Sequence, residues 1–464
     1  MDLKGKRVLV VGMGKSGIAS ALFLADRGAR VSVSDTKSEE ELHHEIPQLL
    51  DRGIGVEAGY HGERTFMQQE LIVISPGVPC DVPQLVQARQ AGIPVFGEIE
   101  LAARYLKGRL VAVTGSNGKT TTTSLVGEIV TAGGKPTLVG GNIGTPAIGF
   151  VEAATDDTWI VLEVSSFQLE TIATFHPRIA VVLNVTPDHL DRHYTFDNYA
   201  AAKARIFENQ TAGDYTVLNA DDATCAAMGK RTKAAVYWFS RQHWVEQGAC
   251  VRGGNIVWND GGREQSVMPV SEIGLKGAHN VENVLAAVCA GMLAGVDAPS
   301  IRHAVASFKA VEHRLEYVAT IRGVAYYNDS KATNVDATIK ALEAFPGNIH
   351  LILGGKDKGS DYSVLNPLLA ERVKRVYTIG AAAQKIESQI KGTHVVSAAT
   401  IDHAVREASE LAAPGDIVLL APACASFDQF MSYEHRGRVF KDLVRQLEAR
   451  DLHLAAGNRA GGGA

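Results

Sequence analysis

The stretch TGSNGKTTTTSL, Thr114–Leu125, decides the fold of this chain. It follows a short apolar run, Leu110–Val113, that predicts a strand, and it opens a predicted helix. Glycines in the turn let backbone N–H groups face an anion beside a helix N-terminus, which is the geometry that binds phosphate. Lys119 adds a cation for the outer phosphates, and the Thr120 hydroxyl suits Mg²⁺. The pattern therefore predicts a site for ATP.

The spacing of this loop departs from the eight-residue pattern GxxxxGK[ST]. The first glycine of that pattern would stand at position 113, which is Val113, and Gly115 lies closer to Gly118 than the pattern requires. A chance GK[ST] on a surface turn is the alternative. The strand before the loop and the helix after it favour the nucleotide interpretation.

Composition limits the class of protein. A chain of 464 residues is too long for one core and predicts about three domains. A net charge of -5 with interspersed lysine and arginine favours neither nucleic acid nor an anionic membrane as a partner. Five cysteines without a CxxC fit a reducing cytoplasm rather than disulfides or zinc. No apolar run reaches the roughly 18 residues of a membrane helix, so we expect no membrane insertion.

The first segment carries a second glycine-rich turn. Strand-like and helical runs alternate from Gly5 to about Gly97, which predicts a parallel sheet with crossover helices. GMGKSG at 12–17 follows the first strand and Asp35 ends the second, the fingerprint of a dinucleotide site. The same turn suits any pyrophosphate-linked nucleoside, and a plain structural turn is the alternative. SPGVP at 75–79 follows another strand, at the edge where such sheets bind ligands.

Two strand ends of the central segment carry metal-binding candidates. The run Trp159–Val164 is apolar on both faces, like a buried parallel strand, except for Glu163. A buried carboxylate needs a partner, either Mg²⁺ beside the phosphate loop or a salt bridge in the core. The next run, Ile179–Val185, leads into TPDHLDRH, where His189 is the candidate nearest the strand end. A structural histidine is the alternative.

Lys203 lies on the inward side of a predicted helix, Asp197–Asn209. The apolar stripe of this helix contains Tyr199 and Ile206, and Lys203 stands between them. Such a lysine can extend its amine to water. It can also hold a functional amine near the metal-bearing strand ends.

The last third of the chain begins with two residues that could reach a nucleotide. Asn280 precedes an apolar helix, where it can be the N-cap or contact a base. Arg314, in the sequence VEHRLE, can reach phosphate or form a surface salt bridge.

Three polar motifs then follow predicted parallel strands. Capping explains part of NDSKATN at 328–334, but not its Asp, Ser, Lys and Thr together. GGKDKG at 354–359 offers two cations to an anionic ligand, and ACASFDQF at 423–430 enters a helix whose N–H groups suit a carboxylate. Cys424 in the last motif is expected to be a packed side chain rather than a nucleophile.

These patterns predict an α/β fold of three domains. Residues 1–97 form a Rossmann-like domain. Residues 98–310 form a P-loop ATPase-like parallel sheet with a small β excursion at 237–268. Residues 311–464 form a second Rossmann-like domain.

The order of the motifs resembles the Mur ligases of bacterial cell-wall synthesis along nearly the whole chain. TGSNGKT, EVSSFQLE, LNVTPDHLDRH, GAHNVEN, EHR, NDSKATN, LGGKDKG and ACASFDQF fall in the order of that family. The DNPR-type motif of the branch that adds a diamino acid is absent, and SSFQLE, NDSKATN and ACASFDQF are similar to the D-glutamate-adding branch. The resemblance implies an ATP-dependent ligase that joins D-glutamate to UDP-N-acetylmuramoyl-L-alanine through an acyl phosphate, and we expect a monomer.

The resemblance also implies roles for individual residues. The ATP-binding set is Gly115, Ser116, Asn117, Gly118, Lys119, Thr120 and Thr121, with Asn280, Arg314 and Asp329 on adenine, phosphates and ribose. The UDP-binding set is Ser16, Asp35, Thr36, Ser75 and Gly77, and the D-glutamate-binding set is Lys331, Thr333, Lys356, Ser426 and Tyr433. Asn142 would touch the transferring phosphate or the UDP substrate.

Two magnesium sites are implied, and the catalytic set is Lys119, Asn142, Glu163, His189 and Lys203. Thr120 and Glu163 would hold one ion, and His189 and Lys203 would help to hold the other. Lys203 is expected as an N-carbamate, because CO₂ converts a costly buried cation into an oxygen ligand. His189 could instead act as a base toward the amine of D-glutamate, and the two roles exclude each other.

Three other functions stay open at this point. An NAD-dependent dehydrogenase would use GMGKSG and Asp35 but leave the phosphate loop without a role. A nucleotide-binding regulatory module would use the loop without the metal ligands. A sister Mur ligase or a folylpolyglutamate synthase-like amide ligase would share the chemistry and differ in the amino acid.

Overall fold

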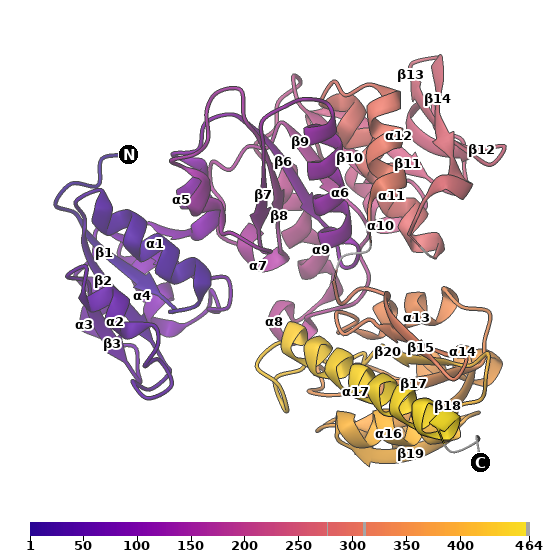
Figure 1. The fold of residues 1–464 in the computed structure, drawn as a ribbon. Coiled ribbons are helices and arrows are strands. Elements are labelled where there is room, and N and C mark those ends of the chain that lie inside the picture. The colour runs from indigo at the N-terminus through magenta and orange to yellow at the C-terminus, as the bar shows by residue number, and fades with distance from the viewer. Residues whose placement is uncertain (276, 310–311, 461–464) are drawn as a thin grey trace. The chain divides into compact units, whose positions relative to one another are not determined.

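The computed structural model describes residues 1–275, 277–309 and 312–460 and contains three β-sheets (Figure 1). The chain divides into two compact units. The first unit comprises Met1–Val185, Arg192–Glu272 and Glu282–Ser307, and the second comprises Thr186–Asp191, Ile273–Val281 and Phe308–Ala464. The predicted boundary between the second and third domains, at 310 and 311, lies outside the described residues.

The first sheet has five parallel strands in the order β3-β2-β1-β4-β5. Its strands are β1 (Arg7–Val11), β2 (Arg30–Asp35), β3 (Gly55–Ala58), β4 (Leu71–Ile74) and β5 (Val95–Gly97). The helices around it are α1 (Lys15–Asp26), α2 (Ile46–Leu50), α3 (Glu63–Met67) and α4 (Pro83–Gln90).

Alternate residues of β1 explain why this sheet is covered on both faces. Val8 and Val10 pack into the same cluster as Leu24 of α1, whereas Leu9 and Val11 pack into the cluster that contains Leu85 of α4. A strand that is buried on both faces needs apolar residues at every buried position, and Val8–Val11 meet this requirement after the exposed Arg7.

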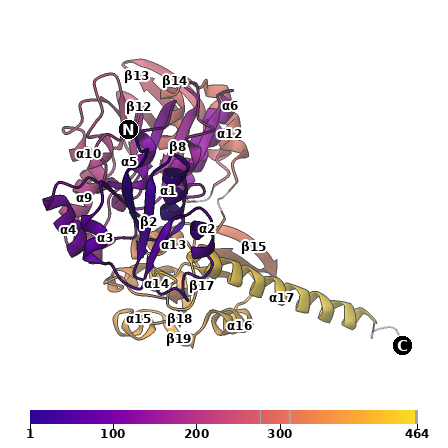
Figure 2. The ribbon, with the colours of Figure 1, turned by 90° about the vertical axis from the view of Figure 1, so that its left-hand side faces the viewer.

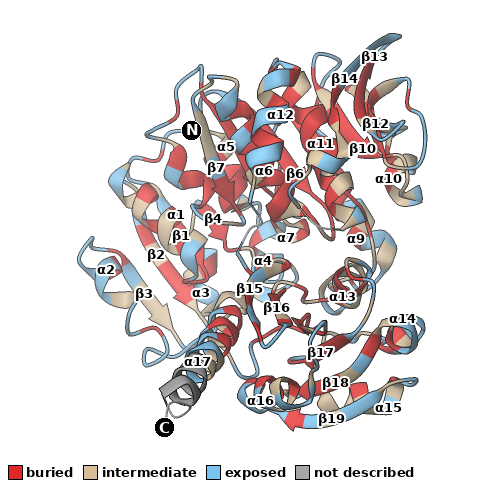
Figure 3. Cartoon of the chain, turned by 45° about the vertical axis from the view of Figure 1, so that its right-hand side comes forward, coloured by how far each residue is buried: buried red, intermediate tan, exposed pale blue. Residues whose placement is uncertain are grey.

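The central sheet has nine strands in the order β14-β13-β12-β11-β10-β9-β6-β8-β7. The parallel strands around the phosphate loop are β6 (Arg109–Thr114), β7 (Thr137–Gly141), β8 (Trp159–Glu163), β9 (Ile179–Val182) and β10 (Tyr215–Asn219). The others are β11 (Ala235–Ser240), β12 (Gln247–Arg252), β13 (Asn255–Asp260) and β14 (Arg263–Pro269). The predicted β excursion is present as β11–β14, but it continues the main sheet, because β11 pairs with β10. In Figure 3 the inner strands of this sheet are mostly buried.

Helices and short 3₁₀ turns connect these strands. The helices are α5 (Glu98–Ala103), α6 (Lys119–Ala132), α7 (Ser166–Leu169), α8 (Leu190–His193), α9 (Phe196–Ala204), α10 (Ala223–Met228), α11 (Ala278–Leu293) and α12 (Ala298–Ser307). The 3₁₀ turns are η1 (Ala147–Phe150), η2 (Arg205–Phe207) and η3 (Val270–Glu272). The helix predicted over Asp197–Asn209 is therefore present as α9, which the 3₁₀ turn η2 follows.

The third sheet has six strands in the order β15-β16-β20-β17-β18-β19, and only β15 is antiparallel to its neighbour. Its strands are β15 (Glu316–Ile321), β16 (Val324–Asn328), β17 (Ile349–Gly354), β18 (Val373–Ile379), β19 (His394–Ala399) and β20 (Ile417–Leu420). Its helices are α13 (Val335–Glu343), α14 (Asn366–Arg372), α15 (Ala383–Gln389), α16 (Ile401–Leu411) and α17 (Tyr433–Ala460), and Ser363–Leu365 forms the 3₁₀ turn η4.

Two clusters cover the faces of this sheet. Leu351 and Leu419 face the cluster under α13 and α14, while Ile352 and Val418 face the cluster under α16 and α17. Figure 2 shows α17 running along the sheet of its own unit and continuing beyond it. Its first half is anchored by Phe440 and Val444, which are fully buried.

Among the described residues, none of the helices combines the length and the apolar character that crossing a lipid bilayer requires.

Candidate active site

The phosphate loop has the predicted strand–turn–helix geometry. β6 ends at Thr114, and α6 begins at Lys119 after Gly118, whose φ of 85° lies in the left-handed region that favours glycine. The Lys119 ammonium donates to the carbonyls of Gly115 (2.8 Å) and Ser116 (2.9 Å). The hydroxyl of Thr121 is buried and has no hydrogen-bond partner in the described part of the chain. This helix N-terminus therefore offers a cation, a spare hydroxyl and backbone N–H groups to an anion.

Glu163 is the centre of a small polar group at the carboxyl end of β8. Its side chain is 1% exposed, and its two oxygens accept from Thr120 Oγ1 (2.7 Å) and Asn142 Nδ2 (2.9 Å). Asn142 follows β7, the neighbour of β8, and its backbone N–H donates to the Glu163 carbonyl (2.9 Å). Two predicted catalytic residues, Glu163 and Asn142, therefore meet the predicted metal ligand Thr120 beside the phosphate loop. A hydroxyl and a carboxylate are hard oxygen donors, so they fit Mg²⁺.

Lys203 points inward, as its position on the stripe of α9 predicts. It is 1% exposed, its ammonium donates to the Gly115 carbonyl (2.8 Å), and it lies 4.4 Å from the ring centroid of Tyr199. The Gly115 carbonyl therefore accepts from two lysines, Lys119 and Lys203. Two ammonium groups on one oxygen repel each other, and converting one of them to an anion would turn this repulsion into attraction.

Sequence reasoning missed two residues that fix the loop. Asn184 Oδ1 accepts from the backbone N–H of Asn117 (2.8 Å), and Asn184 Nδ2 donates to the Asn117 carbonyl (3.1 Å). The Tyr199 hydroxyl is 3.0 Å from Ser116 Oγ. The strand β9 ends at Val182 instead of Val185, so Asn184 is nearer to the strand end than His189. The motif LNVTPD contained this signal, since its asparagine directly follows the apolar run.

The five predicted UDP-binding residues line one cavity of about 590 Å³ in the first unit. Ser16 and Thr36 follow β1 and β2, and Ser75 and Gly77 follow β4. Asp35 closes the turn, because its carboxylate accepts from the backbone N–H groups of Met13 (2.6 Å) and Lys37 (2.9 Å). Lys15, Lys37 and His61 also line the cavity, and sequence reasoning did not name them. Two lysines in such a cavity suit a diphosphate.

His189 lies in the second unit, within the segment Thr186–Asp191. Its φ is 53°, and its Nε2 is 3.6 Å from Asp188 Oδ2. Asp188 in turn accepts from Asn334 Nδ2 (2.9 Å) and pairs with Lys358 (3.5 Å). Asp188, His189 and Lys358 border a cavity of about 520 Å³ in this unit. Lys203 belongs to the first unit, so the predicted pairing of His189 with Lys203 on one metal ion stays a prediction.

Four of the five residues predicted to bind D-glutamate follow β16, β20 and β17, which are neighbours in the third sheet, and the fifth, Tyr433, begins α17. Lys331 Nζ donates to the Tyr433 hydroxyl (3.1 Å) and lies 4.8 Å from the centroid of its ring. Lys356 is exposed, and its backbone pairs with that of Ala425 (2.8 and 3.1 Å) next to Ser426. The Ser426 hydroxyl is buried without a partner in the described residues. The backbone N–H of Thr333 donates to the Lys331 carbonyl (2.8 Å).

Arg436, which sequence reasoning missed, joins two of these turns. Its fully buried guanidinium donates to Ser330 Oγ (2.9 Å), to the Ser330 carbonyl (2.8 Å) and to the Cys424 carbonyl (3.1 Å). Burial lowers the pKa of Arg436 to about 10. The planar fork of an arginine can satisfy carbonyls from separate turns, which a lysine cannot do.

The three predicted nucleotide contacts of the second unit differ in burial. Asp329 is 6% exposed, and its burial raises its pKa to about 6. The charge of Arg314 and the backbone N–H of Leu315 act in the opposite direction, because both favour the ionised carboxylate. Arg314 Nε is buried and has no hydrogen-bond partner among the described residues. Asn280 is the third residue of α11, so the N-cap alternative does not hold.

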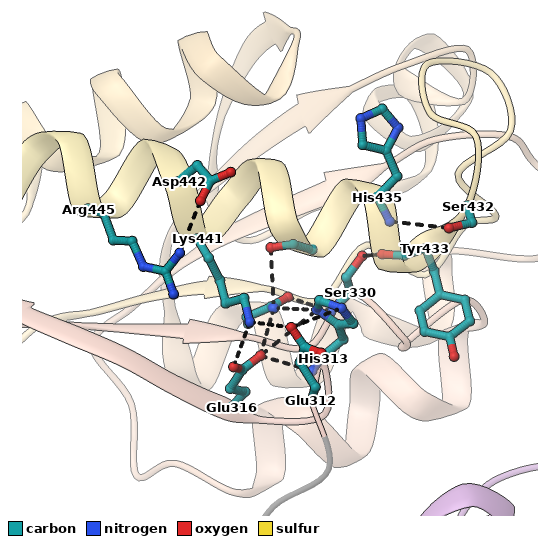
Figure 4. A network of polar contacts seen from close by, with 12 residues as sticks. Glu312, His313, Glu316, Ser330, Ser432, Tyr433, His435, Lys441, Asp442 and Arg445 are labelled. Carbon is teal, nitrogen blue, oxygen red and sulfur yellow. Dashed lines mark hydrogen bonds and ion pairs between the residues drawn. The ribbon is translucent and has the colours of Figure 1, made fainter. Parts of the chain in front are cut away.

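A polar network ties α17 to the segment before β15, as Figure 4 shows. Lys441 pairs with Glu312 (2.5 Å) and Glu316 (2.9 Å). His313 Nδ1 is 2.9 Å from Asn328 Nδ2, and the Ser330 hydroxyl donates to the Tyr433 carbonyl (2.8 Å). Burial acts to lower the pKa of Lys441, but the hydrogen bonds to both glutamates raise it. The network holds the start of α17, and with it Tyr433, against the β16 turn.

Models of three Mur ligase domains match the chain in order. They are the Mur ligase MurD-like N-terminal domain at residues 6–97, the Mur ligase middle domain at 113–291 and the Mur ligase glutamate ligase domain at 313–424. Solved structures with a similar fold include a pseudomurein peptide ligase type C from Methanothermus fervidus (TM-score 0.61, 19% identity, 96% of this chain and 100% of that chain). Another is the MurF ligase from Thermotoga maritima in complex with ADP (TM-score 0.60, 17% identity, 96% of each chain).

Several relatives similar in sequence share one name. The UDP-N-acetylmuramoylalanine–D-glutamate ligase of Koribacter versatilis is 66% identical over 451 residues, which covers 97% of this chain and 100% of the relative. The enzyme of the same name from Geotalea daltonii is 46% identical over 452 residues, with 97% and 100% covered. The chain therefore belongs to the Mur ligase family, in the group of UDP-N-acetylmuramoylalanine–D-glutamate ligases.

Proposed function

We propose that this protein joins D-glutamate to UDP-N-acetylmuramoyl-L-alanine with hydrolysis of ATP to ADP and phosphate. The observation that carries the proposal is the Glu163 carboxylate, which is held by Thr120 and Asn142 beside the phosphate loop. This arrangement suits phosphoryl transfer, and a relative that is 66% identical over 97% of this chain is named for both acceptors. A dehydrogenase would leave this group without a role.

The reaction proceeds in two transfers. An oxygen of the alanine carboxylate attacks the γ-phosphorus of ATP, the bond to the ADP oxygen breaks, and an acyl phosphate forms. The amine of D-glutamate then attacks the acyl carbon, phosphate leaves, and the nitrogen loses a proton as the amide forms. Lys119 would neutralise charge on the γ-phosphate, and Thr121 can donate its spare hydroxyl to a phosphate oxygen.

Magnesium would be held by Thr120 and Glu163, and when bound it supplies charge neutralisation on the phosphates. Asn142 fixes the direction of the Glu163 carboxylate through its amide, and its backbone N–H fixes the strand end. These contacts hold the carboxylate ready without rearrangement, which is how a pre-formed site lowers the barrier.

Lys203 would act as an N-carbamate that contributes to a second magnesium site with His189. Its amine, when neutral, can attack CO₂ and release one proton as the carbamate forms. The Lys203 ammonium is buried and shares the Gly115 carbonyl with Lys119. Both conditions disfavour a second positive charge here, so they support formation of the carbamate. His189 then serves as a metal ligand, and the role of base goes to another group.

In the second unit, Lys331, Thr333, Lys356, Ser426 and Tyr433 would bind the carboxylates of D-glutamate. The unpartnered hydroxyl of buried Ser426 supports this assignment, because a buried donor without a partner costs about 1–3 kcal/mol unless a ligand satisfies it. Asn280, Arg314 and Asp329 would contact adenine, phosphates and ribose. We also propose that the protein is a monomer, which sedimentation tests. The five free cysteines support a cytoplasmic location.

Phosphate release tests the proposal. We expect stoichiometric phosphate only when ATP, UDP-N-acetylmuramoyl-L-alanine and D-glutamate are all present. Replacing D-glutamate with L-glutamate, L-alanine or a diamino acid should abolish it, and a preference for one of these would indicate a sister ligase. Release that needs neither acceptor would indicate a nucleotide-hydrolysing regulatory module instead.

A further inference from the structure

The turn after β17 carries an acidic residue between two lysines. In GGKDKG at 354–359, Asp357 stands between Lys356, which the proposed function places on a carboxylate of D-glutamate, and Lys358. A carboxylate beside two ammonium groups competes with an anionic substrate for them. The turn therefore binds an anion well only if the Asp357 carboxylate is engaged by other groups.

Three donors other than these lysines engage the Asp357 carboxylate. One oxygen accepts from the Tyr362 hydroxyl (2.8 Å) and the Ser360 backbone N–H (3.2 Å), and the other accepts from Lys385 Nζ (2.7 Å). Burial acts to raise the pKa of Asp357, but these hydrogen bonds lower it, so the group is a carboxylate at neutral pH. Lys385 belongs to α15, so a cation from outside the turn balances this charge.

Tyr362 is fixed in place, so its hydroxyl determines where the Asp357 carboxylate lies. The ring is fully buried, and the backbone N–H of Tyr362 donates to Gln389 Oε1 (2.9 Å). The hydroxyl oxygen is also 2.9 Å from Cys424 Sγ, in the turn that carries Ser426. One buried hydroxyl group therefore contacts two of the turns at which the proposed function places D-glutamate.

We propose that Tyr362 is a positioning residue for the amino acid, and that its hydroxyl keeps the Asp357 carboxylate from pairing with the lysines on either side. The inference rests on the proposed function, which places D-glutamate at this turn. Without the hydroxyl, the carboxylate loses its buried donor and is free to turn toward Lys356 or Lys358. The amino acid then binds more weakly, while the sites for ATP and the UDP substrate keep their geometry.

Steady-state kinetics of Tyr362→Phe in the full chain test the inference, because this change removes only the hydroxyl. We expect the KM for D-glutamate to rise about tenfold, the effect of losing one hydrogen bond to a charged group. The KM values for ATP and the UDP substrate should change less than about twofold.

Tyr377→Phe is the matched control. Tyr377 is a fully buried tyrosine on the other face of the same sheet, and its hydroxyl is 3.0 Å from His350 Nδ1. Its loss should also lower stability but should leave the KM for D-glutamate unchanged. The comparison separates a role in the amino-acid site from the cost of removing any buried hydroxyl.

Two further variants act on the same carboxylate. Lys385→Met reaches it from the surface, where the Lys385 side chain is 37% exposed, so folding should persist. Losing this cation should raise the KM for D-glutamate, as Tyr362→Phe does. Asp357→Asn removes the competing charge, so in its background Tyr362→Phe and Lys385→Met should each raise that KM less than about twofold.

The outcomes separate the inference from the function on which it rests. An unchanged KM for D-glutamate in Tyr362→Phe and Lys385→Met, or an equal rise of all three KM values, overturns the inference and leaves the proposed function standing. A tenfold rise that persists in the Asp357→Asn background also overturns it. Phosphate release by the unaltered protein that does not depend on D-glutamate refutes the proposed function, and the inference fails with it.

Discussion

The Thr120 hydroxyl donates to the Glu163 carboxylate over 2.7 Å, which joins the first turn of the phosphate-loop helix to the end of the neighbouring strand β8. Both side chains are at least nine-tenths buried. The pair therefore sets two oxygen ligands side by side before any metal binds.

Removing the charge of Glu163 tests this pair. Glu163→Gln should lower kcat at least about a hundredfold at saturating ATP, because even outer partners of metal ligands are worth roughly 10–100-fold. Magnesium titrations of activity should shift to higher concentration. Glu152→Gln is the control, since Glu152 is an exposed carboxylate of the same unit paired with Arg27 on the surface. Unchanged activity in Glu163→Gln would remove this residue from the metal site.

The proposed carbamate on Lys203 can be tested chemically. Lys203→Ala should lose most activity, and short carboxylates such as acetate should restore part of it by supplying the missing oxygens. Lys203→Arg keeps the cation but cannot form a carbamate, so it should stay inactive and should not be rescued. The protein in ¹³C-bicarbonate should show one carbamate carbon by NMR that is absent from Lys203→Ala. Full activity in Lys203→Arg would contradict the carbamate.

Arg436 should act through the turns that it joins. Arg436→Met leaves the carbonyls of Ser330 and Cys424 without their donor, and we expect roughly 3 kcal/mol less stability. Because those turns hold Lys331 and Ser426, we also expect the KM for D-glutamate to rise about tenfold, more than the KM for ATP. Arg436→Lys keeps the charge but loses the fork, so it should behave like Arg436→Met. Equal changes in both KM values would indicate general destabilisation only.

Glu98 should make stability depend on pH. Burial raises its pKa to about 7 against the N–H groups of Ile148 and Ala147, so the folded state binds this proton more tightly than the unfolded state. Stability should therefore fall as pH rises from about 4.5 to about 7, and stay reduced above that. Glu98→Gln does not titrate and should exceed the unaltered protein by about 2 kcal/mol at pH 8 but not at pH 4. Urea unfolding at both pH values measures the difference.

The sequence predicted the inner parallel strands well because both of their faces are buried. The predicted runs Leu110–Val113 and Trp159–Val164 match β6 and β8 to within one residue at each end. The strands β3, β7, β15 and β19, each at the edge of a sheet, were not predicted, and neither was the inner strand β10, whose sequence YTVLN has only two adjacent aliphatic residues. Edge strands are half exposed, as in the mostly exposed β19, so their residues lack a continuous apolar run.

The residues of the candidate site also divide into those that sequence motifs predicted and those that they did not. Motifs located residues that act through their own side chains, and Thr120, Glu163 and Asn142 do meet in the first unit. Arg436 could not be found this way, because most of its partners are backbone carbonyls of turns from distant parts of the chain. Any residue type can supply a carbonyl, so no motif encodes such a contact.

The most direct test of the central claim is phosphate release from ATP by the purified full chain with each acceptor added alone and together. We expect one phosphate to be released per amide formed, with UDP-N-acetylmuramoyl-L-alanine and D-glutamate both required and other amino acids inactive. Steady phosphate release without D-glutamate, or equal use of another amino acid, would contradict it.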